Sequence, residues 1–98
     1  MTEQDLQTQI IKYITSLPGL AINGQFTKSG IPDLICLVQG RFVAIEVKLD
    51  YNKPSPLQAH YIKHIQELGG LAISAYSLDD VKQLIRANFP DLEKPIEI

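Results

Sequence analysis

The stretch GIPDLICLVQGRFVAIEVK, residues 30–48, decides the fold that we expect. Residues 33–38 form a nearly continuous apolar run, which is typical of a strand in the middle of a sheet. Gln39-Gly40 has the composition of a two-residue turn, and residues 41–48 follow with the alternation of a second strand. The stretch therefore predicts an antiparallel hairpin.

This hairpin places two carboxylates at directly opposed positions on its two strands. Counting outward from the turn, Val38 faces Arg41, so Asp33 faces Glu46. Directly opposed residues share one face of a sheet, with Cβ atoms roughly 5 Å apart. Two carboxylates at that separation repel each other unless a cation lies between them, and oxygen ligands suit Mg²⁺ or Mn²⁺. We therefore predict a metal site there, to which the backbone carbonyl of Val47 could contribute.

Lys48 extends this pattern because it lies two residues beyond Glu46 on the same strand face, about 7 Å along the strand. A metal ion polarises a phosphate and lowers the pKa of bound water, while an ammonium group stabilises the developing negative charge. The three side chains thus predict hydrolysis of a phosphodiester. A Glu-x-Lys pattern alone is common on solvated strands, so the prediction depends on the opposed Asp33.

The remaining sequence predicts three helices and two more strands. Thr2 is the expected cap of the first helix, and Leu57, Tyr61, Ile65 and Leu68 form the expected buried stripe of the second. The resulting order is αβββαβα, an α/β fold with a mixed four-stranded sheet flanked by helices. The expected elements are a helix over 3–17, a strand over 20–27, a helix over 56–68, a strand over 71–76 and a helix over 78–88.

Length and composition fit one globular domain over residues 1–98, with a core at about 3–89 and a polar tail at 90–98. The net charge is −2, but residues 28–64 hold five basic and three acidic side chains, so a nucleic-acid partner is permitted. No apolar run approaches the ~20 residues of a membrane span. The polar start is unlike a secretory signal, and the lone Cys36 fits a reduced thiol, so we expect a cytoplasmic protein.

Gly30-Ile31-Pro32-Asp33, Glu46-Val47-Lys48 and Gln58 near the start of the following helix resemble the PD-(D/E)xK nuclease superfamily. Within it, the chain resembles the virus-type replication-repair nuclease (VRR-NUC) family from Glu3 to about residue 88. The resemblance implies an αβββαβα core and metal-dependent DNA endonuclease activity. Its stand-alone, phage-type members resemble Holliday-junction resolvases, which implies a homodimer that acts on branched DNA, in the host cytoplasm if the chain is viral.

The resemblance also implies roles for Glu3 and Gln58. Glu3 matches an acid on the first helix that supports the metal site, directly or through a water. Gln58 matches a helix glutamine that contacts the site. Each has a plainer interpretation, because the helix dipole stabilises an acid in a first turn and glutamine is a good helix former.

Several polar residues near the expected site are candidates for phosphate contacts. A turn is polar in any case, and an exposed helix face explains the histidine and lysine of the second helix equally well. His60 and His64 could form a metal pair, but the sequence offers no evident third ligand. The DNA-binding candidates are Lys28, Ser29, Gly30, Lys53, His60 and Lys63.

Two other functions compete with the nuclease. The chain could be a DNA-binding or partner-recruited module without turnover of its own, in which the acids are structural. It could also be an antitoxin-like interaction protein with no affinity for nucleic acid.

Overall fold

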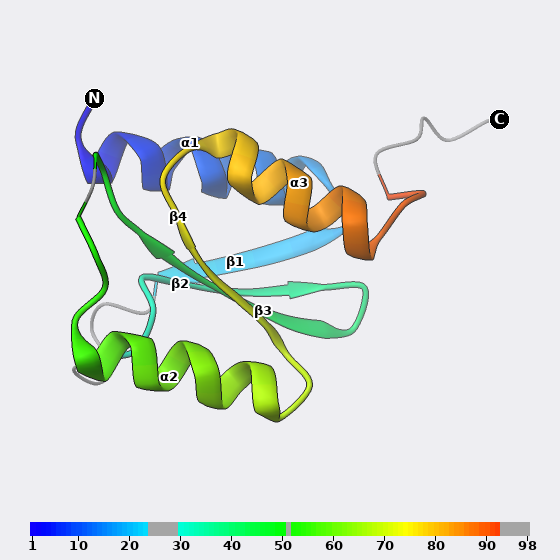
Figure 1. Cartoon of the computed structure of the whole chain (residues 1–98). Coiled ribbons are helices and arrows are strands. Elements are labelled where there is room, and N and C mark those ends of the chain that lie inside the picture. The colour runs from blue at the N-terminus through cyan, green and yellow to red at the C-terminus, as the bar shows by residue number, and fades with distance from the viewer. Residues whose placement is uncertain (24–29, 51, 93–98) are drawn as a thin grey trace, which may run out of the picture.

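A four-stranded mixed sheet with helices on both faces organises the chain in the computed structural model, which describes residues 1–23, 30–50 and 52–92 (Figure 1). The strand order is β1-β2-β3-β4, with the first three strands antiparallel and β4 parallel to β3. The predicted αβββαβα order is confirmed. The elements are α1 (Glu3–Ser16), β1 (Gly19–Asn23), β2 (Leu34–Val38), β3 (Arg41–Val47), α2 (Pro56–Glu67), β4 (Leu71–Ala75) and α3 (Leu78–Asn88).

The β2–β3 hairpin has the predicted turn and the predicted register. Gln39 and Gly40 have φ angles of 47° and 77°, the left-handed backbone that matches the twist of a two-residue hairpin. Val38 pairs with Arg41, as counting from the turn predicted. This register fixes which side chains meet at the far end of the hairpin.

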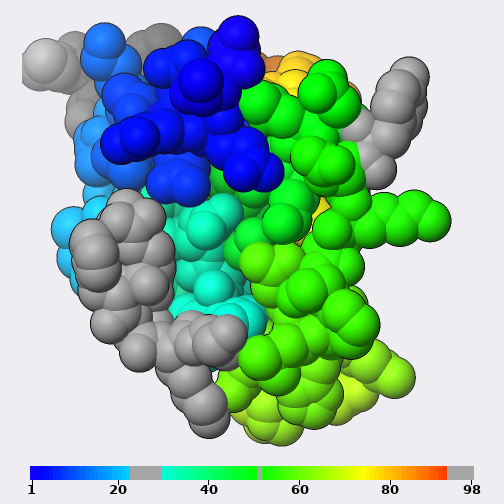
Figure 2. Space-filling view, turned by 90° about the vertical axis from the view of Figure 1, so that its left-hand side faces the viewer, coloured from blue at the N-terminus to red at the C-terminus, as the bar shows by residue number. Residues whose placement is uncertain are grey.

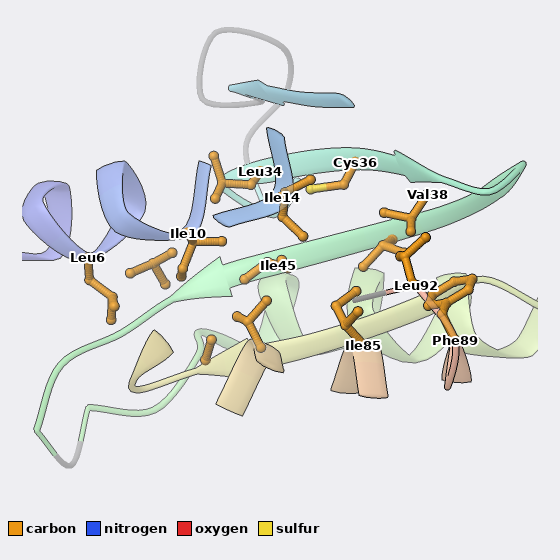
Figure 3. Close-up of a cluster of buried hydrophobic side chains, with 14 residues drawn as sticks. Leu6, Ile10, Ile14, Leu34, Cys36, Val38, Ile45, Ile85, Phe89 and Leu92 are labelled. Atoms are coloured by element: carbon orange, nitrogen blue, oxygen red, sulfur yellow. The ribbon is translucent and has the colours of Figure 1, made fainter. Parts of the chain in front are cut away.

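The hydrophobic core lies between the sheet and the helices α1 and α3 (Figure 3). Thr2 begins α1 with a capping box, in which its hydroxyl accepts from the Asp5 N–H and the Asp5 carboxylate accepts from the Thr2 N–H. The core extends past the predicted limit at residue 89, because Leu92 is buried against it. Its aliphatic members include Leu6, Ile10, Ile14, Leu34, Val38, Val43, Ile45, Val47, Val81 and Ile85.

The opposite face of the sheet carries α2, and here the predicted buried stripe is wrong. No residue of α2 is buried, and Leu57 and Leu68 are 44% and 75% exposed. Within the described residues, α2 lies over β3 and β4 only. The strip of sheet beneath it is therefore too narrow to bury all of its apolar side chains. The small side chains of Ala44 and Ala72 are buried on that strip.

The structure also bears on the expected first strand, on Cys36 and on the expected lack of a membrane span. The strand predicted over 20–27 is observed over Gly19–Asn23, and its remainder falls outside the described residues. Cys36 is free and buried, and burial raises the pKa of its thiol to about 11. Among the described helices, none is both long and apolar enough to cross a membrane.

Candidate metal-dependent active site

Asp33 and Glu46 meet where β2 begins and β3 ends. The last ladder pair is Leu34 with Ile45, so the next opposed pair is Asp33 with Glu46. Each carboxylate accepts a hydrogen bond from the other strand: Glu46 Oε1 accepts from the Asp33 N–H at 3.2 Å, and Asp33 Oδ2 accepts from the Val47 N–H at 2.9 Å. The crossed bonds hold both side chains at one end of the hairpin.

Glu46 is the only buried charged or polar residue among those that the structure describes, and it is 2% exposed. Its pKa is raised to about 7, first because burial disfavours the anion and second because Asp33 repels it. Lys48 and the Asp33 N–H act in the opposite direction. A cation bound beside this carboxyl group would favour its ionised form. A metal site requires that ionised form, because the carboxylate is the ligand.

Lys48 supplies a nearby positive charge. Its Nζ lies 3.7 Å from Glu46 Oε2, and its side chain is only 18% exposed. Its backbone N–H donates to the Ala75 carbonyl at 3.0 Å, which ties the end of β3 to β4. The ammonium group is therefore held at the carboxylate pair and partly shielded from solvent, where electrostatic effects are stronger than in bulk water.

Gln58 reaches the site from α2 in a fixed orientation. Ser55 caps this helix, and its N–H donates to Gln58 Oε1 at 2.8 Å. The other end of the same amide, Nε2, donates to Glu46 Oε2 at 2.9 Å. We did not predict a role for Ser55, although the Ser-x-x-Gln spacing of a capping box is visible in the sequence.

The Gly30-Ile31-Pro32 turn packs the start of β2 against α2. Gly30 has a φ of 87°, and a Cβ at this position would collide with the side chain of Leu57. Pro32 is fully buried. Glycine is thus required both for the backbone conformation and for the close approach that brings Asp33 beside α2.

Glu3 is half-buried in the first turn of α1. Seen from the left-hand side of the molecule, this turn lies at the same end as the start of β2 and the segment between β3 and α2 (Figure 2). Among the described residues, however, no group of three His, Cys, Asp or Glu side chains could hold a metal ion. The structure therefore brings together Asp33, Glu46, Lys48 and Gln58, and the metal role of Glu3 stays a prediction.

The chemistry of the pair fits a hard divalent cation. Asp33 and Glu46 offer oxygen donors, and the repulsion between them is the feature that a cation would relieve. These two side chains, together with the predicted backbone carbonyl of Val47, would hold Mg²⁺ or Mn²⁺.

The predicted DNA-contacting residues are spread more widely. Lys28 and Ser29 lie outside the described residues, Gly30 forms the turn beside α2, and Lys53 is exposed just before α2. His60 and Lys63 are exposed on α2. They line a hollow of about 230 Å³ together with His64 and Glu67, and the rings of His60 and His64 stack with centroids 6.1 Å apart. This arrangement is compatible with phosphate contacts and with a solvated helix face.

Comparisons with known proteins point to one kind of domain. A solved structure described as "VRR_NUC domain" matches with a TM-score of 0.78 and 26% identity, over 89% of this chain and 97% of the other. A second, "VRR_NUC domain protein", matches with a TM-score of 0.68 and 23% identity, over 88% and 86%. No protein-family model and no curated protein matches the chain. The structural match confirms the resemblance to VRR-NUC domains, which are a nuclease family.

Proposed function

From this VRR-NUC fold, we propose that the chain is a divalent-metal-dependent DNA endonuclease that hydrolyses phosphodiester bonds. The observation that carries the proposal is the pair of carboxylates, Asp33 and Glu46, with Lys48 beside them. Glu46 accepts a hydrogen bond from the Asp33 N–H, and Asp33 accepts one from the Val47 N–H. Stability alone does not call for a carboxyl group at the position of Glu46, because burying it costs free energy. We infer that Glu46 is present at this buried position because the proposed reaction needs its carboxylate.

Each residue has a part in the proposed reaction. Asp33 and Glu46 would hold Mg²⁺ or Mn²⁺, which when bound polarises the phosphate and lowers the pKa of the attacking water. The Val47 N–H orients the Asp33 carboxylate, and Gln58 orients Glu46. Lys48 would stabilise the negative charge that develops on the phosphate in the transition state. Glu3 would support the ion from α1.

We further propose that the substrate is branched DNA and that the working unit is a homodimer. One site cuts one strand, so paired cuts across a four-way junction need two sites, and a two-fold dimer supplies them symmetrically. Lys28, Ser29, Gly30, Lys53, His60 and Lys63 would contact the DNA backbone. Binding through phosphates should weaken steeply as the salt concentration rises.

A module without turnover is the alternative, and one observation favours it. Among the described residues, no buried side-chain nitrogen or oxygen lacks a hydrogen-bond partner. Glu46 is satisfied by the Asp33 N–H and by Gln58 without any ion. A purely structural network would have the same appearance.

A cleavage assay separates the two functions. Labelled four-way, flap, duplex and single-stranded DNA are incubated with the protein in Mg²⁺, Mn²⁺ or a chelator. We expect metal-dependent cleavage, greatest on branched substrates, and its loss in Asp33→Asn with DNA binding retained. Asp79→Asn is the matched control, because Asp79 is an exposed acid in the first turn of α3. Unchanged cleavage by Asp33→Asn would contradict the proposal.

A further inference from the structure

The described elements cover only part of one face of the sheet. Within the described residues, α2 lies over β3 and β4, and no helix lies over this face of β1 and β2. Large apolar side chains nevertheless project from it. Leu20 and Ile22 on β1 are 53% and 55% exposed, Leu37 on β2 is 52% exposed, and Phe42 on β3 is 44% exposed.

These side chains form a continuous row because of the strand register. Leu20 is paired with Leu37, and Leu37 is paired with Phe42, so the three lie side by side across the sheet. The row ends at an apolar hollow of about 220 Å³ lined by Phe42, Ile65, Leu68 and Gly70. Leu68 on its rim is 75% exposed. We call Leu20, Ile22, Leu37, Phe42 and Leu68 the open apolar face.

The size of the open apolar face matches what a dimer needs. Five large residues, between 44% and 75% exposed, present on the order of 500 Å² of mostly apolar surface. That is near the upper end of the largest patch on an ordinary monomer, about 300–600 Å². A standard interface buries about 800 Å² on each partner, of which about 65% is apolar in homodimers. The open apolar face could supply nearly all of that apolar part.

We propose that the open apolar face is the contact between two copies of this chain; the inference rests on the homodimer proposed above and gives it a location. In a two-fold contact the same patch must complement itself. A row of projecting side chains beside a hollow meets that requirement, because the row of one copy can fill the hollow of the other. The face has no charged member, and the net charge of −2 opposes association only weakly.

The location is compatible with catalysis. Residues alternate along a strand, so Asp33 and Glu46 share the sheet face of Leu37 and Phe42. Leu37 and Phe42 lie four residues from them, however, which is about 13 Å along the strands. Ile22, which is paired with Ile35, is the member of the open apolar face nearest to Asp33. The contact would thus join the hairpin ends of the two copies and leave the carboxylate ends accessible to DNA.

The test is the mass of the particle in solution, measured by light scattering and sedimentation at 10–100 µM (roughly the range in which moderate dimers form) without DNA or metal. We expect the unaltered chain to have twice its mass of 11.0 kDa. Leu37→Glu and Leu20→Glu should each be monomeric with an unchanged circular dichroism spectrum. Ala87→Glu is the matched control, since it adds the same charge at an exposed position on α3 and should stay dimeric.

Two results would overturn the inference: an unaltered chain that is monomeric throughout this range, or a dimer that persists in both variants. A different protein partner on this face would give the first of these results. The outcome is independent of the proposed chemistry. Asp33→Asn should lose cleavage and stay dimeric, whereas Leu37→Glu should still nick plasmid DNA and lose paired cuts across a junction.

Discussion

The two faces of the sheet differ in burial and in polarity. The face under α1 and α3 is closed and aliphatic, with Leu34, Val43 and Ile45 at 0% exposure. The face toward α2 holds a buried carboxyl group, Glu46, while large apolar side chains such as Leu37 remain exposed. A domain of this size buries a smaller fraction of its surface than a large one, and here most of the fully buried apolar side chains lie on the closed face. We expect the other face to serve chemistry and contacts, and single substitutions on the two faces should have different effects.

The largest effect is expected at Glu46. Glu46→Gln should lower the rate of cleavage at least 10³-fold, or about 4 kcal/mol of transition-state stabilisation. It should not weaken the fold at pH 8, because it replaces a buried anion with a neutral group of similar shape. Initial rates with Mn²⁺ and urea unfolding measure the two effects. Glu67→Gln changes an exposed acid on α2 and serves as control; a Glu46→Gln rate within tenfold of the unaltered chain would refute the assignment.

The next largest effect is on the free energy of unfolding, and it should differ between substitutions on α1 and on α2. Ile10→Ala on α1 should lower the free energy of unfolding by about 2–5 kcal/mol, because it opens a cavity in the closed core. Ile62→Ala on α2 removes the same atoms from a half-buried position and should cost about 1 kcal/mol. Urea denaturation at one protein concentration compares them. Equal losses would mean that the α2 face is as well packed as the other.

The pH dependence of stability is a smaller effect with a definite sign. The pKa of Glu46 is raised from 4.5 to about 7 in the folded chain, so the folded state binds more protons than the unfolded state between these values. Stability from this group should therefore fall as pH rises from about 5 to 8. The loss is on the order of 1–3 kcal/mol, given about 1.4 kcal/mol for each unit of pKa.

Thermal unfolding of metal-free protein between pH 5 and pH 8 checks this dependence. The same series on Glu46→Gln is the control, since it should lack this component. An unaltered chain and a Glu46→Gln variant with parallel profiles would show that Glu46 ionises normally. Addition of Mn²⁺ at pH 7 should raise the unfolding temperature of the unaltered chain only, because the bound ion favours the folded, ionised form.

The smallest effect is expected at Gln58, which positions Glu46 by one hydrogen bond. Gln58→Ala should slow cleavage by less than tenfold, near 1 kcal/mol, the usual net value of such a bond. Gln83→Ala removes a comparable side-chain hydrogen bond on α3, to Asp79, and should leave the rate unchanged. A loss at Gln58 as large as at Glu46 would indicate direct contact with the reacting groups.

Local chemistry made the hairpin predictable. The turn at Gln39-Gly40 and the period of two fix the register, and the register alone brings Asp33 opposite Glu46. The spacing of Glu46 and Lys48 predicted a shared face but not the ion pair. A flexible lysine side chain can reach back along the strand, and its conformation depends on packing that spacing does not reveal.

The second helix was harder to predict from the sequence. The period of Leu57, Tyr61, Ile65 and Leu68 indicates an apolar stripe, but it does not reveal how much sheet lies beneath the helix. Since α2 contacts only β3 and β4 among the strands that the structure describes, the ends of the stripe stay exposed. No described helix covers the same face of β1 and β2, where Leu20 and Leu37 are exposed. The short reach of α2 across the sheet, which the sequence pattern does not reveal, accounts for both observations.

Asp33 and Glu46 should together bind one hard cation across the hairpin, and anomalous diffraction from crystals soaked in Mn²⁺ tests this most directly. We expect an anomalous peak within coordination distance of a carboxylate oxygen of each residue, and no peak in crystals of Glu46→Gln. A peak elsewhere on the chain, or none between these two side chains at saturating Mn²⁺, would contradict the account.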